Sequence, residues 1–239
     1  MTMKAKTIAS SIIGCGAGLL SAAVYMGALD KLHLPQRGKT GTKRVACVGD
    51  SITYGCFVAG QPWNNYPRQL GRLLGKDYSV GNFGYTNRTA INTGDFPYTA
   101  EMLYKRSLEY RPDIVLIMLG SNDTKAINWD SEKYMQDMGS LIDSYRELST
   151  HPEVYLLLPP PVFPFMGKVM WDIRSEVLEN ELIPACRQIA EEKGVTLINT
   201  HDVLTGRKDL FTDGCHPNRK GARLLAETVY TEMIRSILM

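Results

Sequence analysis

Short apolar runs alternate with longer amphipathic stretches throughout residues 43–239, and this alternation constrains the fold more than any other feature. The five apolar runs lie at residues 44–48, 78–83, 114–119, 154–158 and 196–198. Patterns with helical spacing follow them at residues 66–74, 98–109, 130–148, 173–192 and 221–238. Apolar runs of this length suit strands that are buried on both faces. The sequence therefore predicts an α/β fold with a five-stranded parallel sheet covered by helices on both faces.

The same alternation indicates where a functional site would lie. In an open parallel sheet, ligands bind beyond the carboxyl ends of the strands. Motifs that follow the strands are therefore expected to meet at one edge of the sheet. Pro184 interrupts the fourth helical stretch and is expected to kink or split it.

The N-terminal segment differs from the rest of the chain. Lys4 and Lys6 precede an uncharged stretch of roughly 23 residues, 7–29, which is long enough to span a bilayer. This pattern predicts a cleaved signal peptide, with a cleavage site near the small residues Ser21 and Ala23, or an uncleaved membrane anchor.

Two further interpretations of this segment stay open. The residues before Cys15 resemble the lipidation signal of bacterial lipoproteins, and an uncharged helix would also fit inside the folded domain. Residues 1–29 are accordingly interpreted as a signal peptide or membrane anchor, 30–42 as a linker, and 43–239 as one domain. We expect that domain to be extracytoplasmic, either secreted or associated with a membrane through residues 7–29.

Composition excludes several classes of function. The 27 basic and 25 acidic residues give a formal net charge of +2 without a dense basic run, which argues against nucleic-acid binding. The five cysteines show neither metal-ligand spacing nor a dense disulfide framework. Cys56 and Cys215 flank the two motifs described next and could approach each other, but a disulfide has strict geometry that the sequence does not show.

A serine motif directly follows the first predicted strand. Gly49-Asp50-Ser51-Ile52-Thr53 places a small residue and a tight turn at the carboxyl end of that strand. Such a turn exposes the Ser51 hydroxyl and leaves backbone N–H groups pointing outward. On its own, the motif fits equally well a helix-capping serine or a phosphate-binding loop.

A histidine motif lies just before the last predicted helix. Serine is a weak nucleophile and needs a base within hydrogen-bond reach. Histidine is the side chain most often used as such a base, so His216 suits that role. Asp213 precedes it by three residues across a turn at Gly214, so its carboxylate can reach the other ring nitrogen and fix the tautomer. We expect Ser51, His216 and Asp213 to be catalytic, although a lone histidine before a proline would be interpreted as a capped turn.

Two motifs end the second and third predicted strands. Asn82-Phe83-Gly84 offers the backbone N–H of Gly84, and Gly120-Ser121-Asn122-Asp123 offers the side-chain amide of Asn122. With the N–H of Ser51 they make three donors for an oxyanion, and removing one such donor typically costs about 3–4 kcal/mol of transition-state stabilisation. Each motif alone also fits an ordinary turn.

Together, in this order and at these positions, the four motifs resemble the SGNH (GDSL) hydrolase family across residues 43–239. The resemblance implies a flavodoxin-like three-layer α/β/α fold and ester hydrolysis without a metal or organic cofactor. It also implies that the name-giving residues are Ser51, Gly84, Asn122 and His216, with Asp213 completing the triad.

A finer pattern resembles the bacterial branch described as sialate O-acetylesterase-like or carbohydrate acetylesterase-like. The segments that carry it are Tyr66-Pro67-x-Gln69-Leu70, residues 122–129 and residues 158–163. Tyr85 departs from the family pattern, because in the family a smaller residue follows the glycine that corresponds to Gly84. This difference affects the expected shape of the pocket. The candidates for substrate binding are Asp50, Asn128, Trp129 and Phe163.

Three functions are compatible with these residues. The leading hypothesis is a serine esterase that removes small acyl groups, chiefly acetyl, from a small-molecule or glycan ester through an acyl-enzyme. Polar residues near the predicted site favour it: Asn64, Asn65, Asn87, Arg88 and Asn128. The apolar loop 162–171 instead favours a lysophospholipase or acyl thioesterase. A non-catalytic carbohydrate-binding module on the same fold is the third, and the complete set of catalytic residues argues against it.

Overall fold

The computed structural model describes residues 41–238, and a five-stranded parallel sheet lies at their centre. The strand order is β2-β1-β3-β4-β5, and every neighbouring pair is parallel. The strands are β1 (Lys43–Gly49), β2 (Tyr78–Gly84), β3 (Ile114–Met118), β4 (Glu153–Leu157) and β5 (Thr196–Ile198). The predicted strands and the predicted parallel sheet are confirmed.

The register of the central strands brings the motifs to one edge. Every residue of β3 is buried, as expected for a strand with helices on both sides. Gly49 pairs with Gly84 on β2 and with Met118 on β3, so these three strands end level with one another. The strand order reverses at β1, which is where open α/β sheets form their sites. Ser51 and Asn122 therefore start from the same edge.

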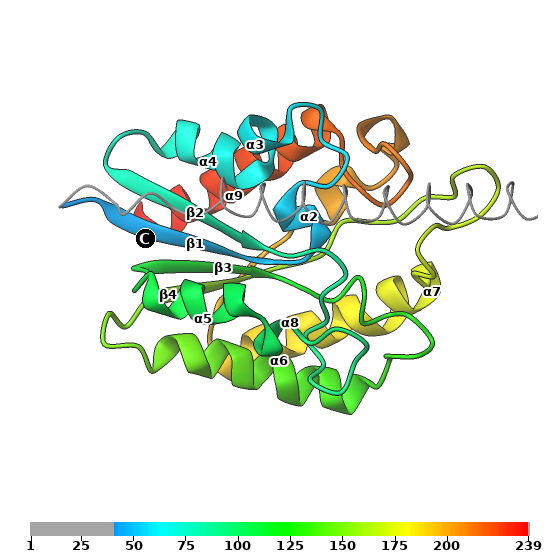
Figure 1. Cartoon of the computed structure of the whole chain (residues 1–239), viewed down its shortest axis with the longest axis horizontal. Helices are drawn as coiled ribbons and strands as arrows, with labels where there is room; N and C mark the ends of the chain where they lie inside the picture. Colours follow the sequence, from blue (N-terminus) through cyan, green and yellow to red (C-terminus); the bar gives the residue numbers. More distant parts are fainter. Residues whose placement is uncertain (1–40, 239) are drawn as a thin grey trace, which may run out of the picture. The chain divides into compact units, whose positions relative to one another are not determined.

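Helices cover both faces of the sheet, as Figure 1 shows. One face carries α2 (Ser51–Tyr54), α4 (Tyr66–Leu74) and α9 (Arg219–Leu238), and the other carries α5 (Met102–Glu109), α6 (Ser131–Arg146) and α8 (Ile183–Lys193). The other elements are α3 (Gln61–Asn64), α7 (Ser175–Val177) and the 3₁₀ turns Tyr98–Ala100, Asp202–Leu204 and Lys208–Leu210. Two clusters of buried apolar side chains fill the spaces between the layers. The predicted three-layer arrangement is confirmed.

Pro184 interrupts the fourth helical stretch, as expected. A π-helical turn, Leu178–Leu182, separates α7 from α8, and Pro184 lies in the first turn of α8. Proline lacks the N–H that a continuing helix needs, and the wider turn before it accommodates the missing hydrogen bond.

The predictions for residues 1–29, and for the 30–42 linker except its last two residues, lie outside the described residues. Within residues 41–238, no helix is both long and apolar enough to cross a membrane. The signal-peptide, anchor and lipidation hypotheses and the expected extracytoplasmic location stay predictions.

Candidate active site

Ser51 is the first residue of α2 and directly follows the turn at the end of β1. Asp50 caps this helix, because its Oδ1 accepts a hydrogen bond from the Ile52 N–H at 2.9 Å. A Cβ at Gly49 would lie 2.5 Å from the carbonyl oxygen of Met118, so the tight turn requires glycine. The first N–H groups of a helix have no intrahelical partner. Within the described residues no hydrogen bond uses the N–H of Ser51, which remains a donor for a ligand.

His216 links Ser51 to Asp213 through its two ring nitrogens. Its Nε2 lies 2.9 Å from Ser51 Oγ, and its Nδ1 lies 2.7 Å from Asp213 Oδ2. All three residues are buried. The structure thus brings together the three residues that the sequence predicts, with the spacing that activation of a serine by a general base requires.

The Asp213 carboxylate accepts four hydrogen bonds. Its Oδ1 accepts from the backbone N–H groups of Cys215 and His216, at 3.0 and 2.7 Å. Its Oδ2 accepts from His216 Nδ1 and from Trp171 Nε1, the latter at 2.8 Å. Burial raises the pKa of Asp213, but the hydrogen bonds from His216 and Trp171 outweigh it and hold the pKa well below its ordinary value. An ionised carboxylate only accepts, so Nδ1 carries the proton and Nε2 is the base that faces Ser51.

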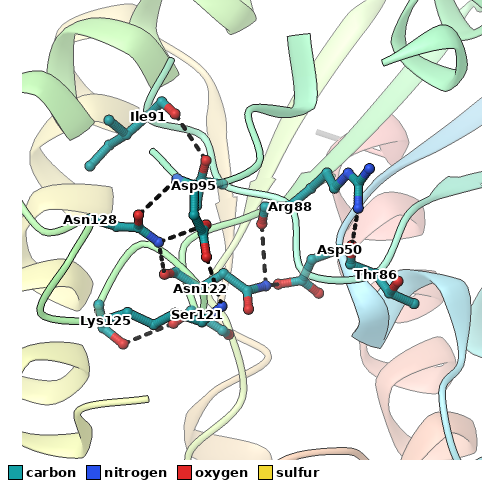
Figure 2. Close-up of polar contacts among 11 residues, drawn as sticks. Asp50, Thr86, Arg88, Ile91, Asp95, Ser121, Asn122, Lys125 and Asn128 are labelled. Atoms are coloured by element: carbon teal, nitrogen blue, oxygen red, sulfur yellow. Dashed lines mark hydrogen bonds and ion pairs between the residues drawn. The ribbon is translucent and has the colours of Figure 1, made fainter. Parts of the chain in front are cut away.

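Asn122 follows β3, and its side chain points toward Asp50 (Figure 2). Its Nδ2 lies 3.3 Å from Asp50 Oδ2 and 3.2 Å from the carbonyl oxygen of Arg88. Both contacts are long, so an oxyanion would be a stronger acceptor for this amide. Burial raises the pKa of Asp50 to about 6. Asp50, predicted to bind substrate, caps α2 and orients Asn122.

Asn128 holds the turn that contains Asn122. Its Nδ2 donates to the carbonyl oxygen of Asn122 and to Asp95 Oδ1 (Figure 2). Both distances are 2.9 Å. Its Oδ1 accepts from the Asp95 N–H at 2.9 Å. Asn128 was predicted to bind substrate, but these contacts and its burial make it a support for Asn122.

Asp123 is a buried carboxylate to which the sequence analysis assigned no role. Its two oxygens accept from the N–H groups of Ala90 and Ile91, at 3.1 and 2.8 Å. Burial raises its pKa to about 7. These bonds fasten the loop that follows β2 to the turn that follows β3. The position of Asp123 next to Asn122 in the motif is the signal that could have indicated this role.

The expectation that the Gly84 N–H binds the oxyanion differs from the structure. This N–H donates to Asn82 Oδ1 at 2.9 Å, and a Cβ at Gly84 would lie 2.2 Å from the backbone nitrogen of Tyr54. Glycine is required here because α2 packs directly on the end of β2. In the following loop, 85–88, Asn87 has a φ of 65°, and its N–H makes no hydrogen bond within the described residues.

Two aromatic side chains with no predicted catalytic role flank His216. The ring centroids of Phe57 and Trp171 lie 5.1 and 5.7 Å from that of His216. Both side chains remain exposed, by 54% and 43%. Both residues have left-handed φ values, 59° and 66°, which bulky residues rarely adopt and which are often found at functional sites. Phe57 and Trp171 therefore form an aromatic rim beside the histidine.

Trp129 and Phe163 were both predicted to bind substrate, and their contacts lie elsewhere. Trp129 lies two residues before the start of α6. Its Nε1–H donates to Glu181 at 2.7 Å, and its ring packs against the hydrophobic core. The Phe163 ring packs on Phe211, and its N–H donates to the Gly214 carbonyl at 2.8 Å. Phe163 therefore supports the turn between Asp213 and His216 through its backbone N–H.

Cys56 and Cys215 do not pair. Both are free thiols, and the other described cysteines, Cys47 and Cys186, are free as well. Within residues 41–238, no group of three or more histidine, cysteine, aspartate or glutamate side chains is arranged to hold a metal ion.

The model of the GDSL-like lipase/acylhydrolase family matches residues 47–224, which contain all of the motifs described above. The chain belongs to this family. This is the SGNH (GDSL) hydrolase family that the sequence resemblance predicted.

Two curated relatives resemble this chain. An acetylxylan esterase from Xylanibacter ruminicola is 37% identical over 205 residues, which cover 78% of this chain and 42% of the relative. A multidomain esterase from Ruminococcus flavefaciens is 27% identical over 218 residues, which cover 76% of this chain and 27% of the relative. The chain therefore spans less than half the length of either relative.

Solved structures share the fold of this chain. An aryl esterase of M. smegmatis matches with a TM-score of 0.64 at 24% identity, covering 82% of this chain and 99% of the other. A carbohydrate acetylesterase family member from Sinorhizobium meliloti matches with a TM-score of 0.63 at 21% identity, and the match covers 83% of this chain and 100% of the other. These matches confirm the fold class.

Proposed function

We propose that this SGNH hydrolase removes small acyl groups, chiefly acetyl, from carbohydrate through an acyl-enzyme on Ser51. The observation that carries the proposal is the continuous hydrogen-bonded series from Ser51 Oγ through the His216 ring to Asp213 Oδ2. The choice of substrate is supported by the relatives, which include an acetylxylan esterase and a carbohydrate acetylesterase.

Acylation begins when Ser51 Oγ attacks the ester carbonyl carbon and His216 Nε2 takes the hydroxyl proton. The ionised Asp213 stabilises the resulting imidazolium. The tetrahedral oxyanion is bound by the Ser51 N–H and Asn122 Nδ2. The N–H of Asn87 takes the place that the sequence analysis gave to Gly84. The imidazolium then protonates the alcohol as the C–O bond breaks, which leaves the acyl group on Ser51.

Deacylation repeats these steps with water. His216 Nε2 takes a proton from the water that attacks the acyl carbon, and then returns it to Ser51 Oγ as the carboxylic acid leaves. In each half of the cycle His216 takes one proton and then gives it up, first from Ser51 to the alcohol and then from water to Ser51, so the ring is neutral again after each half.

A lysophospholipase or thioesterase activity is the second candidate. The loop 162–171 exposes apolar side chains, with Met166 90% and Phe165 37% accessible. Such side chains would suit an acyl chain longer than acetyl.

The length of the preferred acyl chain distinguishes the two candidates. We expect kcat/KM on p-nitrophenyl esters to be highest for acetyl or propanoyl and to fall beyond butanoyl, because a small-acyl site has no room for a longer chain. Each buried methylene contributes about 0.8 kcal/mol, so a true acyl channel would give a several-fold rise per pair of methylenes.

A Met166→Ser variant serves as the control for this series. It should leave the acetyl ester rate unchanged, because Met166 is almost fully exposed. The acetylesterase proposal would be rejected in favour of the lipid or thioester candidate if kcat/KM of the wild type rose steadily up to the octanoyl ester and this rise were smaller in Met166→Ser.

Trp171→Phe tests the hydrogen bond from the indole to the triad. The change keeps an aromatic ring beside His216 but removes a donor to the Asp213 carboxylate. Hydrogen bonds to charged groups contribute about 1.5–3 kcal/mol, and we expect part of this to appear as a roughly tenfold lower kcat with KM little changed. Steady-state kinetics on p-nitrophenyl acetate measures the effect.

Trp129→Phe is the matched control, since it removes an indole N–H that donates to Glu181 outside the triad. Its kcat should equal that of the wild type. Equal losses in both variants would show that Trp171 contributes only packing.

A further inference from the structure

A recessed and positively charged groove lies between α4 and the beginning of α9. Its volume is about 580 Å³. Four basic side chains line it, namely Arg72, Arg219, Lys220 and Arg223, and no acidic side chain does. Asn64 and the buried Gln69 also line the groove. Such a surface attracts anions, although the net charge of the whole chain is only +2.

Both walls of the groove continue from the catalytic loops. The chain that carries Ser51 in α2 leads into α3 and α4, and α9 begins three residues after His216. Figure 1 shows α3, α4 and α9 together on one face of the sheet. Three residues of extended chain span about 11 Å at most, so the backbone of Arg219 in the groove wall lies no farther than that from His216.

Hydrogen bonds fix the two walls relative to each other. The buried Gln69 donates through Nε2 to the carbonyl oxygens of Asn64 and Arg219, at 2.6 and 3.3 Å. Arg72 donates to the carbonyl oxygen of Trp63 at 2.8 Å. The Arg72 guanidinium and the backbone of Arg219 are thus held in place before a ligand binds, which reduces the entropy lost on binding.

The stability of the fold does not account for Arg219 and Lys220. Arg72, Arg219 and Lys220 make no ion pair within residues 41–238, while Arg223 pairs with Glu227 at 2.7 Å. Three of the four basic residues lie in the first turns of α9, which contain no acidic residue. Cations at a helix N-terminus oppose the helix dipole and are unfavourable there.

We propose that this groove binds a carboxylate of an acidic glycan while Ser51 acts on an ester of the same glycan. The inference rests on the proposed function and extends it to charged substrates. Trp63, 69% exposed beside the groove, offers a flat apolar face for a sugar ring. A recessed groove suits a single sugar acid better than it suits a flat anionic membrane.

The test compares two acetylated oligosaccharides of equal length, one with and one without a single uronic acid. Wild-type protein should cleave the acidic substrate with about fivefold higher kcat/KM at low salt, because two or more exposed charge pairs of ordinary strength together have an effect of that size. The Arg219→Gln/Lys220→Gln double variant should lose this preference. Its thermal stability should be unchanged or slightly raised, since the helix dipole is relieved.

Arg235→Gln is the matched control, because it removes a cation from the other end of α9. It should keep the preference, and all variants should cleave p-nitrophenyl acetate equally. A wild type without preference for the acidic substrate, or a double variant that keeps the preference, overturns the inference while the proposed function stands.

Two binding measurements complete the test. If the wild type binds phosphatidylglycerol vesicles, the double variant does not, and neither oligosaccharide is preferred, the inference is overturned in favour of a membrane. Titration of Ser51→Ala protein with the deacetylated acidic oligosaccharide tests the groove even if no ester is cleaved: binding supports it, and no binding overturns it.

Discussion

Ser51→Ala should lower kcat on p-nitrophenyl acetate by about 10⁴-fold to 10⁶-fold, the range found when a triad nucleophile is removed. Alanine keeps the Cβ and the backbone of α2 but removes the Oγ that lies 2.9 Å from His216 Nε2. Water must then attack without an acyl-enzyme, and only substrate binding and the oxyanion donors still contribute. A burst assay with purified protein measures the loss.

The fold should survive this change. Loss of one hydrogen bond typically costs about 0.5–1.5 kcal/mol, which urea unfolding measures. His216→Ala should match Ser51→Ala in kcat, and the double variant should be scarcely worse, because the residues act as a unit. Near wild-type turnover in a folded Ser51→Ala protein would mean that another residue is the nucleophile.

The sequence predicts the layers of this fold well because burial has a clear signature. Strand β3 consists of apolar residues throughout, which a strand between two helical layers requires. The motifs follow strands that end level in the sheet, so their convergence follows from the topology alone. Pro184 likewise predicts an interruption of the fourth helical stretch, because proline has no N–H to make the backbone hydrogen bond of a continuous helix.

Side-chain directions in the loops are less predictable. Gly84 serves close packing against α2, and the sequence does not distinguish this from presenting a donor. Trp129 and Trp171 are both tryptophans in loops that follow strands, yet one donates to Glu181 and the other to Asp213. The difference depends on backbone conformation: Trp171 has a left-handed φ of 66°, which no local pattern indicates.

Asp213→Asn should lower kcat by about 10⁴-fold while the fold is kept, because it reverses the histidine tautomer. Asp213 Oδ1 accepts two backbone N–H groups, so an asparagine would keep its oxygen there and place its NH₂ where Oδ2 lies. That NH₂ would donate to His216 Nδ1 and force the proton onto Nε2. The Nε2–H would then point at Ser51 Oγ and could not act as a base. The NH₂ would also face the Trp171 N–H, which is a second donor.

The pH dependence of stability separates this explanation from simple unfolding. The folded-state pKa of Asp213 lies below its ordinary value, so the ionised carboxylate stabilises the wild type above about pH 4. This stabilisation is lost as the pH falls through the lower, folded-state pKa. The difference in free energy of unfolding between wild type and Asp213→Asn should therefore be largest at neutral pH and shrink in acid, as urea unfolding at several pH values would measure. A variant that keeps its turnover within tenfold would show that Asp213 does not orient His216, whatever the stability curves show.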